Sequence, residues 1–322
     1  VRLMESGPAG GALFAGEIAE KLGLGSVLSF DMGGTTAKIC LIEDAKPTTA
    51  NVFEVDRSYR FKKGSGMPIS IPVIEMVEIG AGGGSIATVD NMSQIRVGPH
   101  SAGSEPGPAC YQRGGVRPTV TDADLLLGRL DPHNFAGGAI VLDTQASAEA
   151  LVADIGSHLS LDALDCAYGL SEVVDESMAN AARAHAVENG RAIDEFTMIA
   201  FGGAAPIHAA RLGEKLGITK VLIPPSAGVG SAVGFLKAPF GYEVIRSSFK
   251  RVDAVSMDDI NTVFDEISSE CQAFLEQGTD GAEPVWERRA FMRYVGQGWE
   301  IPVELPARRY TEADRQVLKD LF

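Results

Sequence analysis

Asp31-Met-Gly-Gly-Thr-Thr-Ala-Lys38 is the stretch that decides the fold. Apolar residues 26–30 precede it and apolar residues 39–42 follow it, which predicts two buried strands joined by a glycine-bearing turn. Gly33 and Gly34 allow backbone N–H groups to approach an anion, because neither residue carries a Cβ. The segment therefore predicts a hairpin that can receive a phosphate group.

Three polar side chains strengthen this interpretation. Thr35 and Thr36 add hydroxyl donors to the turn. Asp31, at the end of the first strand, can hold a hydrated divalent cation beside phosphate. An ordinary Gly-Thr hairpin turn, with Asp31 satisfying its own backbone, fits the same residues. The octet alone leaves both interpretations open.

Length, charge and cysteine content narrow the class of protein. The chain has 322 residues, which suggests two domains at roughly 150 residues each. The formal net charge of −15 argues against nucleic acid and anionic membrane surfaces as partners, although a local glycine turn can still bind a nucleotide. The four cysteines include no Cys-x-x-Cys pair, so we expect a reducing cytoplasm rather than a zinc or disulfide framework. No apolar run approaches the ~18 residues of a membrane span.

A second glycine-rich segment follows residue 79 and lies between two apolar runs. Gly82, Gly83 and Gly84 would let the backbone lie flat against a ligand. Glu78, just before them, is a candidate carboxylate directed into the same cleft. A plain flexible turn is the alternative interpretation of these glycines.

Residues 97–121 form the longest segment without a regular pattern. A loop of that length is usually functional or disordered. His100 lies in this loop and is a candidate catalytic base, although a lone loop histidine is more often a surface residue. Asp122 and Asp124 follow the loop in a pattern typical of a helix N-terminus, so their role is expected to be structural.

The apolar residues 197–201 predict a further buried strand, which continues into Gly202, Gly203 and Ala204 and then into a helix over residues 207–216. Strand, glycine turn and helix in this order place a helix N-terminus against a nucleotide. A lone Gly-Gly turn has low specificity by itself. Long helices are also predicted over residues 6–22 and 162–189.

The order of the motifs is more specific than any one motif. Residues 31–36 resemble the phosphate-binding hairpin of the actin/hexokinase/Hsp70-like ATPase superfamily, and residues 201–209 resemble its adenosine motif. The other motifs are Ser6-Gly-Pro-Ala-Gly-Gly11, Ile79-Gly-Ala-Gly-Gly-Gly-Ser85, Gly98-Pro-His-Ser-Ala-Gly103, Pro106-Gly-Pro-Ala-Cys-Tyr111, Pro118-Thr-Val-Thr-Asp-Ala-Asp124 and Ile223-Pro-Pro-Ser-Ala-Gly-Val229. With them, nearly the whole chain resembles the hydantoinase A/5-oxoprolinase family, which includes subunits of acetone and acetophenone carboxylases.

The resemblance implies an α/β fold and a division of the chain. Residues 1–246 would form an actin-like ATPase lobe of the ribonuclease H-like type, with a mixed sheet and flanking helices. Residues 247–322, where the composition changes, would form part of a C-terminal α+β domain. Family members carry an earlier Asp-x-Gly-Gly-Thr hairpin that is missing here, so the chain is expected to be the downstream lobe of a longer protein or to receive the N-terminal lobe from another polypeptide.

The resemblance also implies an activity: ATP-dependent hydrolysis of a cyclic amide of the hydantoin or 5-oxoproline type, through phosphoryl activation of the carbonyl. Asp31 would hold Mg²⁺ or Mn²⁺ through water and act in catalysis with Glu78 and His100. ATP would contact Gly33, Gly34, Thr35 and Thr36 through its phosphates, and Gly202, Gly203 and Ala204 through its adenosine. Gly82, Gly83 and Gly84 would face the substrate.

Two other functions stay open at this point. The chain could belong to an ATP-dependent ketone carboxylase, which these motifs do not separate from a cyclic amidohydrolase. It could also be a nucleotide-binding module without turnover, because the first hairpin is missing. The family implies a hydantoinase B-type partner subunit and an oligomer.

Overall fold

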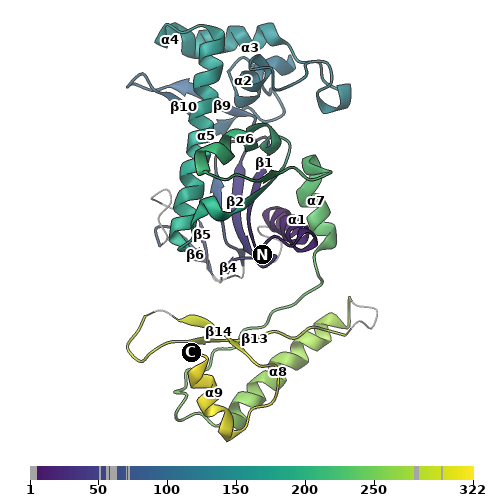
Figure 1. Cartoon of the computed structure of the whole chain (residues 1–322), viewed down its shortest axis with the longest axis vertical. Helices are drawn as coiled ribbons and strands as arrows, with labels where there is room; N and C mark the ends of the chain where they lie inside the picture. The colour runs from purple at the N-terminus through teal and green to yellow at the C-terminus, as the bar shows by residue number, and fades with distance from the viewer. Residues whose placement is uncertain are drawn as a thin grey trace. The chain divides into compact units, whose positions relative to one another are not determined.

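A computed structural model of the chain describes residues 6–50, 52–55, 58, 64–69, 71, 73–278, 283–298 and 300–322. The chain divides into two compact units, Val1–Ala238 and Pro239–Phe322, so the division falls eight residues before the boundary expected after residue 246 (Figure 1). In the part of the chain that is described, no helix is both long enough and apolar enough to cross a membrane.

The first unit is built on a six-stranded mixed sheet. Five strands follow the order β12-β11-β1-β2-β3, and β8 also pairs with β2. The β1–β2 pair is the predicted antiparallel hairpin, whereas β11 runs parallel to both β1 and β12. The strands of this sheet are β1 (Ser26–Met32), β2 (Ala37–Glu43), β3 (Lys46–Pro47), β8 (Met76–Ile79), β11 (Thr197–Phe201) and β12 (Val221–Leu222).

Shorter strands pair outside the sheet, and helices surround it. The short strands are β4 (Thr49–Ala50) with β7 (Val73–Ile74), β5 (Phe53–Val55) with β6 (Met67–Ile69), and β9 (Ser85–Val89) with β10 (Ile95–Ser101). The helices of this unit are α1 (Ser6–Leu22), α2 (Val120–Leu126), α3 (Thr144–Leu151), α4 (Ser157–Leu159), α5 (Ala163–Glu188), α6 (Ala205–Leu216) and α7 (Gly230–Lys237). β10 occupies the start of the segment predicted to be irregular, so that prediction was wrong for residues 97–101.

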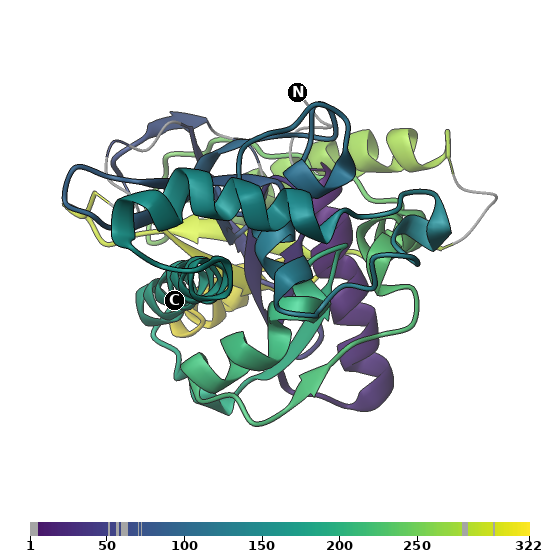
Figure 2. The same ribbon diagram turned by 90° about the horizontal axis from the view of Figure 1, so that it is seen from above.

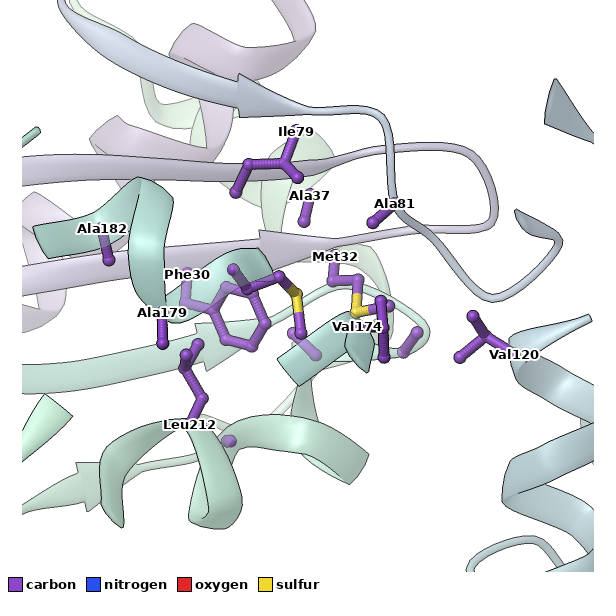
Figure 3. Close-up of a cluster of buried hydrophobic side chains, with 14 of the residues drawn as sticks. Phe30, Met32, Ala37, Ile79, Ala81, Val120, Val174, Ala179, Ala182 and Leu212 are labelled. Atoms are coloured by element: carbon purple, nitrogen blue, oxygen red, sulfur yellow. The ribbon is translucent and has the colours of Figure 1, made fainter. Parts of the chain in front are cut away.

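Side chains that alternate along the strands separate two apolar cores. On β1, Leu28, Phe30 and Met32 belong to the larger core, where α5 and α6 cover the sheet (Figure 3). The residues between them point to the other face, on which α1 and α7 pack. The period of two in a strand produces this division. α1 and α5 accordingly lie on opposite sides of the strands (Figure 2).

Glycines bring α1 and α7 into close contact. A Cβ on Gly234 would lie 1.9 Å from the Gly10 carbonyl oxygen, and one on Gly10 would lie 2.4 Å from the Ser231 carbonyl oxygen. Only residues without a side chain permit this approach. The small-residue stretch near residue 230 is therefore a packing surface for α1.

The second unit has its own small core. A hairpin of β13 (Arg288–Met292) and β14 (Ile301–Leu305) packs with α8 (Met257–Leu275) and α9 (Arg315–Asp320). The buried Asn261 amide donates to the Tyr310 carbonyl at 2.7 Å and accepts from the Tyr310 N–H at 2.8 Å. These bonds satisfy both backbone groups of Tyr310 inside the core.

Candidate functional site

A row of charged residues crosses the end of the sheet on its α1/α7 face. Asp31 on β1 lies directly opposite Lys38 on β2, and Lys38 lies opposite Glu78 on β8. Directly opposed residues on neighbouring strands share one face. The Lys38 ammonium lies 3.3 Å from a Glu78 carboxylate oxygen and donates to the Thr36 hydroxyl at 2.8 Å. The row therefore places one cation between two carboxylates.

Asp31 lies in a crowded, half-buried position. The Ser231 hydroxyl on α7 donates to Asp31 Oδ2 at 2.7 Å. Burial raises the pKa of the Asp31 carboxyl, while the Ser231 hydrogen bond and the charge of Lys38 oppose that rise. A Cβ on Gly202 would lie 2.6 Å from Asp31 Oδ1, and Gly202 has φ +98°. A glycine is thus required beside this carboxylate.

The hairpin turn at residues 33–36 is open on its outer side. The Gly33 N–H donates to the Thr36 carbonyl at 3.1 Å and closes the turn. Nothing lies within 4 Å of a Cβ built on Gly33 or Gly34, and Gly34 and Thr35 are exposed. In the described part of the chain, the N–H groups of Gly34 and Thr35 have no hydrogen-bond acceptor. Two donors of the turn are therefore available to a ligand.

The glycine run at residues 82–84 is buried directly behind this turn. The Gly83 N–H donates to the Gly33 carbonyl at 3.0 Å, and the Gly84 N–H donates to the Gly34 carbonyl at 2.7 Å. A Cβ on Gly82 would lie 2.5 Å from the Thr35 nitrogen. The structure thus shows these glycines supporting the turn, and their contact with a substrate stays a prediction.

The turn at residues 202–204 lies beside the hairpin. Phe201 pairs in register with Asp31, and the Ala204 N–H donates to the Met32 carbonyl at 2.9 Å. Nothing lies within 4 Å of a Cβ on Gly203. α6 begins at Ala205, directly after this turn. The two sequence motifs are therefore adjacent at one end of the sheet.

Two predicted catalytic residues are less closely connected to this site. Glu78 is linked to the site by its ion pair with Lys38, and 51% of its side chain is exposed. His100 lies on β10 and is exposed, and among the described residues no hydrogen bond connects its side chain to Asp31. The described residues also contain no group of three His, Cys, Asp or Glu side chains arranged for a metal. A metal ion here would rely on Asp31 together with ligand atoms.

A buried charged cluster behind the site was missed by the sequence interpretation. The His208 ring on α6 lies between Asp175 of α5, at 2.7 Å from Nδ1, and Asp124 of α2, at 3.2 Å from Nε2. Arg129 forms an ion pair with Asp124 at 3.0 Å. One signal was present in the sequence, since Asp175 interrupts the apolar stripe that Val174 and its neighbours form on α5.

The comparison with known sequences identifies the family. The hydantoinase/oxoprolinase profile matches residues 1–244. The chain belongs to this family. The caprolactamase subunit alpha of Pseudomonas jessenii is 33% identical over all of this chain and 46% of its own length. The 5-oxoprolinase of Saccharomyces cerevisiae is 31% identical over 90% of this chain and 23% of its own length. The chain thus spans less than half the length of these curated relatives.

Solved structures of family members have the same architecture. The ATP-dependent caprolactamase of P. jessenii superposes with a TM-score of 0.77 at 32% identity, covering 98% of this chain and 45% of that one. A nucleotide-free acetone carboxylase superposes with a TM-score of 0.79 at 29% identity, with the same coverage. The predicted fold class, a mixed α/β sheet with flanking helices of this ATPase family, is confirmed. Several of the relatives are named as subunits of larger enzymes.

Proposed function

We propose that this chain is the nucleotide-binding part of an ATP-dependent enzyme that hydrolyses a cyclic amide. The observation that carries the proposal is the contact between the 31–36 hairpin and the 202–204 turn, made through the Asp31–Phe201 register and the Ala204–Met32 hydrogen bond. Both segments present glycines with open space in front of them. One ATP molecule can therefore contact both, with its phosphates on the hairpin and its adenosine on the turn.

The hairpin offers the groups that a triphosphate requires. The N–H groups of Gly34 and Thr35 and the hydroxyls of Thr35 and Thr36 would donate to phosphate oxygens, while Gly33 shapes the turn. Fixed donors of this kind stabilise the charge that spreads over the equatorial oxygens during phosphoryl transfer. Lys38, half-buried beside Thr36, adds a positive charge close to the same oxygens.

Asp31 fits the role of a magnesium-holding carboxylate. Mg²⁺ in proteins is usually held by one or two carboxylates together with phosphate oxygens and water, so a single carboxylate beside a phosphate turn is a suitable donor set. Ser231 fixes one Asp31 oxygen and the lack of a side chain at Gly202 leaves room at the other. When bound, Mg²⁺ or Mn²⁺ would neutralise phosphate charge.

The proposed reaction overcomes the low reactivity of an unstrained amide. The γ-phosphoryl group of ATP passes to the carbonyl oxygen as the amide nitrogen loses its proton, which leaves ADP and an imidate phosphate. Water adds to the activated carbon, the ring C–N bond breaks with protonation of nitrogen, and a second water releases phosphate from the acyl phosphate. Glu78 and His100 are our candidates for moving these protons. The segment that contains Gly82–Gly84 is our candidate for the side of the site that faces the substrate.

An ATP-dependent ketone carboxylase is the second candidate, because the acetone carboxylase structure superposes as well as the caprolactamase structure does. In either case the rest of the enzyme, including an N-terminal lobe and a hydantoinase B-type subunit, would complete the active site. The subunit names of the relatives support such partners and an oligomer. Four buried, unpaired thiols support a cytoplasmic setting.

Nucleotide binding and substrate-dependent phosphate release test the proposal. Calorimetric titration of ATP with Mg²⁺ should show binding that Asp31→Ala abolishes and Glu20→Gln, on an exposed part of α1, leaves unchanged. Phosphate release by the complete enzyme should then increase with hydantoin, 5-oxoproline or caprolactam. Stimulation by acetone with bicarbonate alone would favour the carboxylase, and equal ATP affinity in the Asp31→Ala variant would refute the assignment of the site.

A further inference from the structure

The His208 cluster, formed by His208, Asp124, Asp175 and Arg129, has a geometry that favours a charged imidazole, because a carboxylate lies beside each ring nitrogen. Nδ1 forms a hydrogen bond with Asp175 at 2.7 Å, whereas Nε2 lies 3.2 Å from an Asp124 oxygen, within ion-pair distance but without a hydrogen bond. A neutral imidazole has one N–H donor and one acceptor, so one nitrogen would point its lone pair at a carboxylate. The imidazolium donates from Nδ1 to Asp175 and places its positive charge beside Asp124.

The charge balance of the cluster agrees with this geometry. His208, Asp124 and Asp175 are fully buried, and an uncompensated charge in such a place is costly. With His208 protonated, two cations face two carboxylates, because Arg129 pairs with Asp124 and also donates to Ser171 at 2.8 Å. Burial alone would lower the pKa of His208, but the two aspartates beside its ring outweigh that effect and raise the pKa to about 9.

Other charged groups near His208 pair among themselves. The strands beneath α6 present apolar side chains of the main core to it. Towards the surface, two glutamates of α5 face two basic residues of α6. These are Glu172 and Glu176 on α5, and Arg211 and Lys215 on α6. Among the described residues, Asp124 and Asp175 are the titratable groups that pair with the His208 ring.

The cluster connects the hairpin turn at residues 33–36 with the turn at residues 202–204. Thr121, in the first turn of α2, donates its N–H and its hydroxyl to the Gly83 carbonyl, both at 2.8 Å, and Gly83 supports the hairpin turn. Asp124 lies one turn further along α2. His208 lies one turn into α6, which begins directly after the 202–204 turn. We propose that protonated His208 is a positioning residue that fixes the distance between the hairpin turn and the 202–204 turn.

The positioning role rests on the proposed function, because it concerns ATP binding. The charge state of His208 does not, and it can be measured separately. Long-range proton–nitrogen NMR of the histidine rings, with His208→Gln to assign the signal, should show both His208 ring nitrogens protonated at pH 7.5 and a titration near pH 9. A ring that is neutral at pH 7.5 would overturn the inference, whether or not ATP binds.

The second measurement follows the affinity for ATP with Mg²⁺ between pH 6 and pH 9.5. In the wild type, affinity should fall by at least about fivefold as pH passes 9, the low end of ordinary coupling between sites. Asp175→Asn keeps the Arg129–Asp124 pair but places an amide donor opposite Nδ1, so neutral imidazole fits and the profile should flatten. His133→Gln, at an exposed position, should retain the wild-type profile.

The outcomes separate the two proposals. Wild type and Asp175→Asn with the same pH profile would overturn the positioning role while leaving ATP binding intact. Failure of the wild type and every variant to bind ATP would refute the proposed function, and the NMR titration would still decide the charge of the cluster.

Because the folded pKa of His208 lies above its unfolded value near 6.5, its contribution to stability is complete below pH ~6.5 and is lost as pH rises through about 9.

Discussion

Two glycine segments of this protein have similar composition but opposite surroundings. The hairpin turn at residues 33–36 is partly exposed, and nothing lies near a Cβ built on either of its glycines. The run at residues 82–84 is buried, and every one of its glycines would carry a Cβ within about 3 Å of other atoms. The first segment leaves space for a ligand, whereas the second fills space with backbone.

The difference shows that one requirement, the absence of a Cβ, serves two separate purposes. In the buried run, the missing side chains permit the hydrogen bonds from Gly83 and Gly84 to the hairpin carbonyls. In the exposed turn, the missing side chains leave backbone N–H donors accessible to a ligand. Substitutions in the two segments should therefore affect different measurements, stability in one and ligand affinity in the other.

Gly82→Val is expected to have the largest effect, on stability. The new Cβ would lie 2.5 Å from the Thr35 nitrogen, and its nearest neighbours are all backbone atoms of Gly34 and Thr35, which leaves little room for adjustment. Overpacking of this kind costs about 3 kcal/mol of unfolding free energy. Urea denaturation followed by circular dichroism measures the loss. Gly25→Val, with nothing within 4 Å of its Cβ, is the control, and equal midpoints for both variants would show that the run does not pack against the turn.

Asp31→Asn should leave stability nearly unchanged and weaken ATP binding. Asparagine retains an oxygen that accepts from Ser231 but loses the charge that would hold a cation. We expect about a 100-fold loss of affinity in Mg²⁺, equivalent to about 2.7 kcal/mol. Chelation of the metal with EDTA should weaken the wild type to a similar degree and affect the variant little. A variant whose affinity still depends on Mg²⁺ would assign the metal to other residues.

Much of the fold was predictable because its signals are local. The β1–β2 hairpin, α1, α5 and β11 each follow from the spacing of apolar residues within one segment, and the structure confirms them. The adjacency of the hairpin and the 202–204 turn is not a local property, since the parallel pairing of β1 with β11 joins segments about 170 residues apart. That contact was expected only through the resemblance to a family.

The His208 cluster shows why other features escaped prediction. Asp124 occurs in a segment typical of a helix start, and the neighbouring Asp122 does form a capping box with Thr119. A structural role was therefore a reasonable prediction for both. Only the packing of α2, α5 and α6 brings Asp124, Asp175 and His208 together, and no single segment contains that information. The burial of a charge depends on partners that are distant in sequence.

Gly34→Ala tests the exposed segment with a smaller change. No atom lies within 4 Å of the added methyl group, and Gly34 does not adopt a positive φ, so stability should change by less than ~0.5 kcal/mol. The methyl group would obstruct the approach of phosphate to the turn, and we expect about a tenfold loss of ATP affinity, or about 1.4 kcal/mol. Unchanged affinity measured by calorimetry would mean that ATP does not contact this turn.

Glu78→Gln should have the smallest effect on both stability and binding. The ion pair with Lys38, at 3.3 Å, is half exposed, and pairs of this kind contribute less than ~1 kcal/mol. Glutamine keeps the side-chain size, and the charge of Lys38 remains beside Asp31 and the phosphate turn. If Glu78 moves a proton in the reaction, phosphate release by the complete enzyme should fall while ATP affinity stays near that of the wild type.

Lys38→Met is the matched comparison, because it removes the same ion pair together with the cation beside Thr36, and it should therefore weaken ATP binding. Equal loss of affinity in both variants would indicate that Glu78 acts only by positioning Lys38.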